Sequence, residues 1–236
     1  MAEQPTKAPF TWHENAVTLL LAGVGGSIDA IGYLMFAGLF MGFMSGNSTL
    51  LGLNSGQQHW AKAGHFIFTI LLFLLGVMVG ARLPNRRLAL ALALEAGLVA
   101  LVLGWQAWGG FSPTTQEAAY FFPRVALLAA TMGIQAGALR KVGAQSIHTT
   151  FVTGDLTSLG ALLAGSAAAP GADQAARQAK ADAKGMLAGV WAVYVLGAAA
   201  GAVAFGYQAQ GALLLPLCLL VAALGISARW PASTTV

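Results

Sequence analysis

Charged residues are scarce in this chain: Asp, Glu, Lys and Arg make up 8% of its 236 residues, whereas 57% are hydrophobic. Soluble globular proteins carry about 25% charged residues. The segment 185–228 contains no charged residue, and the segment 15–61 contains only Asp29. A membrane-crossing helix needs about 20 consecutive apolar residues. These runs therefore argue against a soluble domain and predict an integral membrane protein.

Cysteine and the signatures of catalysis are equally sparse. The one cysteine, Cys218, cannot form an internal disulfide, and no spacing typical of a zinc site is present. There is no nucleophile–base pattern, no phosphate-binding glycine loop and no solvent-accessible pair of carboxylates. The net charge of +4 comes from basic residues in short connections, which indicates membrane topology rather than a nucleic-acid surface. We therefore expect no enzymatic activity, no cofactor, no metal and no nucleic-acid partner.

Six apolar segments are long enough to cross a lipid bilayer. They cover residues 16–34, 63–81, 88–108, 124–139, 185–207 and 211–229. Two further segments, 35–56 and 144–165, are apolar but carry a polar motif, and the Ala-, Gln- and Lys-rich stretch 167–184 is predicted to be a cytoplasmic linker. The sequence predicts an all-α polytopic membrane protein that forms a single membrane domain over residues 1–236.

One polar pattern occurs twice within this apolar sequence. Residues 44–52 read MSGNSTLLG and residues 152–160 read VTGDLTSLG, so that each residue lies 108 positions from its counterpart. Asn47 and Asp155 occupy the same place in the two copies. Because such residues are unfavourable in an apolar segment, their recurrence predicts an internal repeat. Repeat one would cover about 16–108, and repeat two about 124–229.

The basic residues favour one of two topologies. If both motif segments enter the membrane and return to the same side, only Lys62 and Arg124 lie on one face. The ten on the other face are Lys7, Arg82, Arg86, Arg87, Arg140, Lys141, Arg177, Lys180, Lys184 and Arg229. This bias is typical of a cytoplasmic face. It favours six crossings plus two re-entrant or short helices, inverted repeats and cytoplasmic termini. The alternative is eight crossings with parallel repeats, which divides the basic residues five to seven.

In the re-entrant arrangement, each motif would begin a short helix inside the membrane. Gly46 and Gly154 would let the chain turn, and Asn47 and Asp155 would cap the helices. Since helix N-termini present free N–H groups and partial positive charge, we predict a substrate or ion site there. Its expected members are Ser45, Gly46, Asn47, Thr49, Thr153, Gly154, Asp155 and Thr157. The alternative is that the hydroxyls bond back to helix carbonyls and the glycines only allow close packing.

Three more polar residues lie within the predicted spans. Asp29 is a carboxylate in the first span, and acids inside a membrane are costly and commonly functional. We assign it to the site as a proton or cation ligand; as an alternative, it would pair with Arg140 or Lys141. Gln135 joins the site as a hydrogen-bonding group. Glu95 is predicted to be either a second proton site or a protonated packing residue.

The motifs resemble a known family. Gly26-x-x-Asp29-x-x-Gly32-Tyr33 precedes the first motif, and Met132-Gly133-Ile134-Gln135-Ala136 precedes the second. Over residues 15–230 the chain is similar to the YoaK-like bacterial membrane proteins, the uncharacterised domain family DUF1275. It departs from the family pattern at Ser45, where Thr is usual, and at Ala136, where Asn is usual. The resemblance implies a multi-pass protein of the bacterial inner (plasma) membrane, but it does not indicate a particular activity.

Taken together, the polar repeat and the charge bias predict a channel or transporter for a small polar solute or ion. The alternative function is a non-transporting membrane scaffold or assembly factor, since helices rich in Ala and Gly pack closely with partners. The bilayer is the one partner that composition requires. The sequence leaves open the solute, the coupling ion and assembly into a homo-oligomer.

Overall fold

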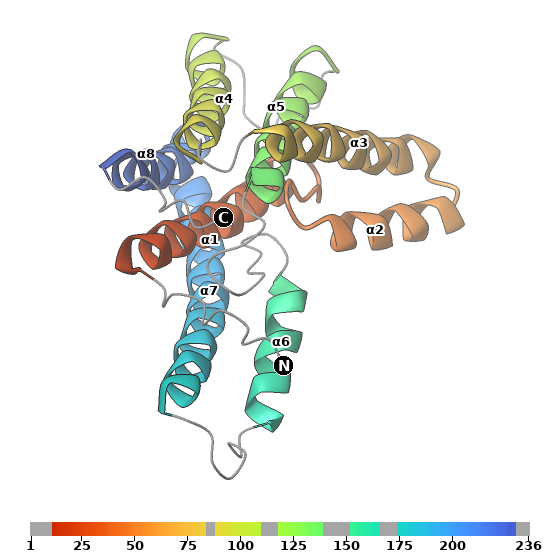
Figure 1. Cartoon of the computed structure of the whole chain (residues 1–236). Helices are drawn as coiled ribbons and strands as arrows, with labels where there is room; N and C mark the ends of the chain where they lie inside the picture. The colour runs from red at the N-terminus through yellow and green to blue at the C-terminus, as the bar shows by residue number, and fades with distance from the viewer. Residues whose placement is uncertain (1–10, 84–87, 110–117, 139–151, 166–173, 230–236) are drawn as a thin grey trace.

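The structure is a computed structural model of the whole chain, and it describes residues 11–83, 88–109, 118–138, 152–165 and 174–229. Over these residues the chain forms α-helices and one short 3-10 turn, and no strand (Figure 1). The helices are α1 (Trp12–Met35), α2 (Met44–Gly56), α3 (Trp60–Arg82), α4 (Leu88–Gly109), α5 (Ala118–Ala138), α6 (Val152–Ala164), α7 (Gln174–Tyr207) and α8 (Leu214–Arg229). The predicted all-α class is confirmed.

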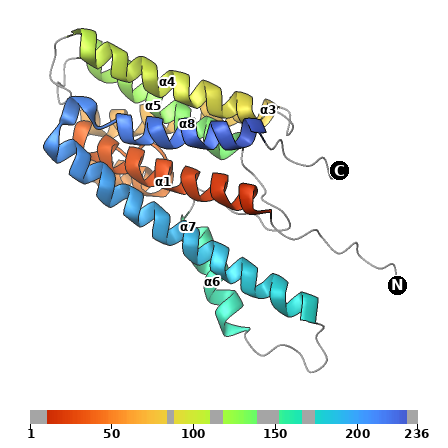
Figure 2. The ribbon, with the colours of Figure 1, turned by 90° about the vertical axis from the view of Figure 1, so that its left-hand side faces the viewer.

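Six of these helices, namely α1, α3, α4, α5, α7 and α8, are long and apolar enough to cross a membrane. The other two, α2 and α6, have 13 residues each. At 1.5 Å per residue such a helix is about 20 Å long, which is shorter than a hydrocarbon core of about 30 Å. The structure therefore has six spans and two short motif helices rather than eight spans. The start of α1 and the end of α8 lie at the same end of the bundle (Figure 2).

Close backbone contacts at glycine join α1 to α7. A Cβ atom at Gly26 would overlap the carbonyl oxygen of Tyr194 and lie 2.9 Å from the backbone nitrogen of Ala198. On the facing helix, a Cβ at Gly197 would lie 2.8 Å from the Cα of Gly23. Small residues drive association of membrane helices because they let the backbones approach. The glycines of the first span therefore serve helix packing.

The same kind of contact joins α3 to α5. A Cβ at Gly80 would lie 3.0 Å from the backbone nitrogen of Ala138, and a Cβ at Gly137 would lie 2.9 Å from that of Ala81. Both pairs use glycines spaced four residues apart, as in Gly76-x-x-x-Gly80 on α3. This spacing aligns the small residues along one helix face.

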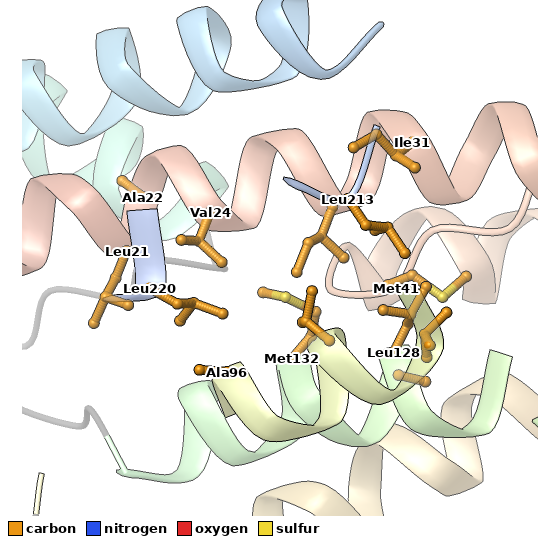
Figure 3. Packing of buried hydrophobic residues seen from close by; sticks show 14 of the residues in the cluster. Leu21, Ala22, Val24, Ile31, Met41, Ala96, Leu128, Met132, Leu213 and Leu220 are labelled. Carbon is orange, nitrogen blue, oxygen red and sulfur yellow. The ribbon is translucent and has the colours of Figure 1, made fainter. Parts of the chain in front are cut away.

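The buried core lies between α1, α4, α5 and α8. Leu21 of α1, Ala96 of α4, Met132 of α5 and Leu220 of α8 belong to one cluster of buried apolar side chains (Figure 3). α1 is the central helix, since 72% of its most apolar stretch is buried inside the protein, compared with 22% for α7. The outer faces of α3 and α7 expose large apolar side chains, which suits contact with lipid.

The polar stretch before the fifth span differs from its prediction. α7 is helical from Gln174 onward and continues without a break to Tyr207. The predicted linker 167–184 is thus, from Gln174 on, the first part of one 34-residue helix. Its residues Arg177 and Lys180 are exposed. The helix continues N-terminal to its apolar part because this stretch is rich in the helix-forming residues Ala, Gln, Arg and Lys.

Candidate functional site

A tight turn ends α1 and sends the chain back along the helix. Ala37 has φ of 54° and Gly38 has φ of 94°, both in the left-handed region. The N–H of Gly38 donates to the carbonyl of Tyr33 at 2.9 Å, which satisfies a carbonyl at the helix end. Gly42 then reaches Asp29, six residues before the end of α1, so the chain has returned by about 9 Å. α2 begins beside this point.

Asp29 fixes the returning segment. Its Oδ1 accepts hydrogen bonds from the N–H groups of Gly42 at 2.6 Å and Phe43 at 3.3 Å. Its Oδ2 accepts a hydrogen bond from the hydroxyl of Tyr194 on α7 at 2.7 Å. The side chain is 3% exposed. One carboxyl group therefore joins α1, the segment before α2 and α7. The alternative partners Arg140 and Lys141 lie outside the described residues.

Asn47 is buried, but it does not cap α2. The helix begins at Met44, and its N-cap residue, Phe43, makes no side-chain capping bond. The Asn47 Oδ1 accepts the N–H of Phe40 at 3.0 Å, and its Nδ2 donates to the carbonyl of Phe40 at 2.6 Å. The side-chain amide thus bonds to both the N–H and the carbonyl of one loop residue, as the backbone of a paired β-strand does. The prediction that Asn47 caps the helix was wrong, because α2 begins three residues earlier and Asn47 lies in its first turn.

Gly46 does not form the turn that the sequence predicted. The chain reverses at Ala37 and Gly38, and Gly46 lies inside α2. A Cβ atom at Gly46 would overlap the ring of Phe43. Glycine is therefore needed at this position for space beside an aromatic ring.

The hydroxyl residues of both motifs lie on outward faces. The exposed ones are Ser45, Ser48, Thr49, Thr153, Thr157 and Ser158. The Thr49 hydroxyl donates to the carbonyl of Ser45 at 3.0 Å, and the Thr157 hydroxyl donates to that of Thr153 at 2.9 Å. The two threonines thus bond back to their own helices, which is the arrangement weighed as an alternative to a solute site.

The buried members of the second motif and of α5 are Asp155 and Gln135. Asp155 lies in the first turn of α6 and is 1% exposed, while Gly154 beside it is half-buried. Residues 139–151, which precede α6, lie outside the described part of the chain. Gln135 is fully buried, and its Nε2 donates to the carbonyl of Leu21 at 3.1 Å, which links α5 to α1.

The two short helices pack on different long helices. α2 packs on α3, α6 packs on α7, and the two pairs extend in different directions from the centre (Figure 1). Among the described residues, α2 and α6 do not pack extensively on each other. The structure brings Asp29 and Asn47 to the two ends of one segment, Phe40–Phe43, through bonds from both side chains.

Two polar residues, one partly and one fully buried, were not predicted for the site. Tyr194 is the partner of Asp29, and a tyrosine in the middle of the apolar run 185–207 was the available signal. Arg124 is fully buried within α5, although its charge was expected at the membrane surface. Its Nε donates to the carbonyl of Tyr120 at 2.7 Å, and its guanidinium lies 5.5 Å from the centre of the Phe36 ring.

Comparisons with known proteins agree with this membrane architecture. Residues 17–226 match the family described as "Protein of unknown function (DUF1275)". The chain is 28% identical over 155 residues to the "UPF0700 transmembrane protein YoaK" of Bacillus subtilis (strain 168), an alignment that covers 62% of this chain and 66% of that protein. No solved structure matches the chain. Since the family match extends over most of the sequence and all six spans, this multi-pass membrane protein belongs to the DUF1275 family.

Proposed function

We propose that this protein is a channel or transporter for a small polar solute or ion in the bacterial inner membrane. The observation that carries the proposal is the burial of Asn47 and Asp155 at matching places in two short helices, within a bundle of apolar spans. Non-helical backbone at membrane depth is tolerated only where protein buries it or where it lines a wet cavity. Asp29 and Gln135 are also buried polar residues. The proposal involves no enzymatic step and no cofactor.

An inverted internal repeat supports this proposal. α2 and α6 have the same length, and both their first and their last residues are 108 positions apart. The packing of α1 on α7 corresponds to that of α5 on α3, and the packing of α2 on α3 corresponds to that of α6 on α7. Likewise α1 packs on α8 as α5 packs on α4. Three spans in each repeat make the repeats inverted, with both termini on the cytoplasmic side. Transporters built this way bind their solutes near the repeat interface.

The first short helix has a fixed orientation that suits a solute site. Asp29 and Asn47 hold the segment Phe40–Phe43 by four hydrogen bonds with the backbone. The segment that leads into α2 is therefore held about 9 Å inside the end of α1, and α2 packs on α3. Its first N–H groups lie at membrane depth, where helix N-termini attract negative or hydrogen-bonding groups. A small anion or a hydroxyl-bearing solute matches this chemistry.

Flux measurements on the reconstituted full chain test the proposal. Proteoliposomes are assayed with a panel of labelled inorganic ions, small polyols, amino acids and organic acids. Asp155→Asn should lower the flux of the transported compound at least tenfold, because it alters a buried group of the proposed pathway. Thr157→Val is the matched control, since Thr157 lies on the exposed face of the same helix and should keep wild-type flux. Absence of flux for the whole panel contradicts transport, whereas equal flux in both variants contradicts the role of Asp155 in the proposed pathway.

A membrane scaffold or assembly factor is the second candidate. It is favoured by an apolar groove of about 540 Å³ between α1, α7 and α8, which Leu19, Leu196 and Leu219 help to line. An apolar helix of a partner, or of a second copy in a homo-oligomer, would fit such a surface. Purification in mild detergent followed by mass measurement distinguishes the candidates, because a scaffold retains a stoichiometric partner.

A further inference from the structure

Glu95 is a third buried carboxyl group, besides Asp29 and Asp155. It is the eighth residue of the 22-residue helix α4, and it is 0% exposed. The buried face of α4 is otherwise almost wholly apolar: it comprises Ala91, Leu92, Glu95, Ala96, Val99, Val102 and Gln106. These positions recur every three or four residues, so Glu95 faces the protein rather than lipid. Its neighbour Ala96 lies in the core with Met132 and Leu220 (Figure 3).

Glu95 differs from an ordinary structural acid because it has no partner. Neither carboxyl oxygen accepts a hydrogen bond from any group in the part of the chain that the structure describes. α4 packs on α5, α8 and the 3-10 turn Ala209–Gly211. Their titratable or charged groups among the described residues are Tyr120, Arg124, Cys218 and Arg229. The Arg124 guanidinium bonds to Tyr120 and lies over Phe36, whereas Cys218 and Arg229 are exposed.

We propose that Glu95 is an intramembrane proton-binding site, which holds its proton in the closed packing seen here. A carboxylate in such surroundings would be an unpaired buried charge, and a group in that position neutralises instead. Proton release requires water to reach the side chain between α4 and α5 or α8. The carboxyl O–H bond then breaks, the proton passes to that water, and the carboxylate becomes hydrated.

A proton fits this site better than a metal cation does. Sodium- or calcium-like cations need several oxygen ligands around them. The neighbouring buried residues Leu92, Ala96 and Val99 supply none from their side chains, and Gln106 lies about 16 Å further along the helix. The site therefore accommodates one proton on one carboxyl group. The role of that proton as a coupling ion rests on the proposed transport function, whereas the proton site itself does not.

Infrared difference spectroscopy of the full chain in lipid vesicles tests the site directly. A protonated carboxyl gives a C=O stretching band apart from those of carboxylates and amides, and the chain has only eight Asp and Glu residues. We expect such a band at neutral pH, shifted in deuterated water and lost on raising the pH. Glu95→Gln should abolish it. If the band persists in Glu95→Gln, or the wild type has none, the proposal is overturned.

Three variants make this assignment specific. Glu95→Asp keeps an acid at the position and should keep the band at an altered frequency, so that its loss in Glu95→Gln is not a consequence of misfolding. Asp29→Asn removes the other buried acid of the first half and should leave the Glu95 band unchanged. Gln106→Leu removes a buried polar group from the same face of α4 and should also retain it. Disappearance of the band in both Asp29→Asn and Gln106→Leu overturns the assignment.

Proton flux separates the failure of this inference from failure of the proposed function. Proteoliposomes containing a pH-sensitive dye receive an acid pulse, and the proton itself is the probe. Glu95→Gln should lower the protein-dependent proton flux at least tenfold, and wild-type flux in that variant overturns the role of the Glu95 proton as a coupling ion. A Glu95 band without solute flux in the panel above removes the transport proposal and leaves the proton site standing.

Discussion

Asp29 and Glu95 are both carboxylic acids within membrane helices, and both are nearly or completely buried. Asp29 accepts three hydrogen bonds, from Gly42, Phe43 and Tyr194. Glu95 accepts none from the described part of the chain. The same functional group therefore serves architecture at one place, where it holds a returning loop and α7. At the other it makes no hydrogen bond within the described residues, which agrees with the proton site proposed above. The comparison predicts opposite responses to removal of each acid.

The largest effect is expected for Asp29→Leu. The substitution leaves two backbone N–H groups and one hydroxyl buried without their acceptor, and each such group costs about 1–3 kcal/mol. The free energy of unfolding in mixed micelles should fall by about 3–5 kcal/mol. Asp29→Asn, which keeps one acceptor oxygen, should lose less than half as much. An unchanged stability in Asp29→Leu would show that the carboxyl group is not structural.

A smaller effect is expected for Gly26→Ala, which disturbs Asp29 indirectly. The added methyl group overlaps the carbonyl oxygen of Tyr194 and forces α7 away from α1. Overpacking of this kind costs about 1–3 kcal/mol. Gly225→Ala is the matched control, because its Cβ meets nothing within 4 Å and alanine favours a helix by about 1 kcal/mol over glycine. Thermal unfolding of the two variants should move in opposite directions.

Tyr194→Phe tests the single bond between α7 and Asp29. It removes a hydroxyl that donates to Oδ2 at 2.7 Å, and hydrogen bonds between membrane helices contribute about 0.6–2 kcal/mol. We expect a loss of about 1 kcal/mol in the free energy of unfolding. Tyr207→Phe serves as the control, since Tyr207 is 89% exposed. A double-mutant cycle with Asp29→Leu, which removes both acceptor oxygens, should give a coupling energy of similar size; purely additive losses would rule out the bond.

The smallest effect on stability is expected for Glu95→Leu. Replacing an unpaired buried acid with an apolar side chain of similar volume deprives no donor of its acceptor. The free energy of unfolding should stay within about 1 kcal/mol of wild type or rise. The same unfolding assay in micelles measures it. A loss comparable to that of Asp29→Leu would reveal a structural role for Glu95 and cancel the contrast between the two acids.

The spans were predictable because a bilayer leaves the backbone few choices. In lipid every N–H and C=O must be satisfied within a helix, so the uncharged runs 63–81 and 185–228 had to be helical. The repeated motif likewise located two short helices, although these begin at Met44 and Val152 and not at the predicted caps Asn47 and Asp155. Composition and spacing alone thus located the six spans and both short helices.

The local geometry of the site was not predictable, because side chains distant in the sequence determine it. Phe40 pairs with Asn47, seven residues later, and Gly42 pairs with Asp29, thirteen residues earlier. These bonds shift the start of α2 to Met44 and make Asn47 a partner of the loop rather than a cap. Tyr194 approaches Asp29 only because glycines bring α1 and α7 together, a contact that no periodicity reveals.

The bond between Asp29 and Tyr194 also has a consequence for biogenesis, since its two residues are 165 positions apart. At a synthesis rate of about 5–20 residues per second, the ribosome makes Tyr194 about 8–33 s after Asp29. Until then α1 and α2 lie in the translocon or the lipid, and Oδ2 of Asp29 lacks the hydrogen bond that the Tyr194 hydroxyl later donates. A nascent chain arrested before α7 should consequently be the form that insertases and quality-control proteases recognise.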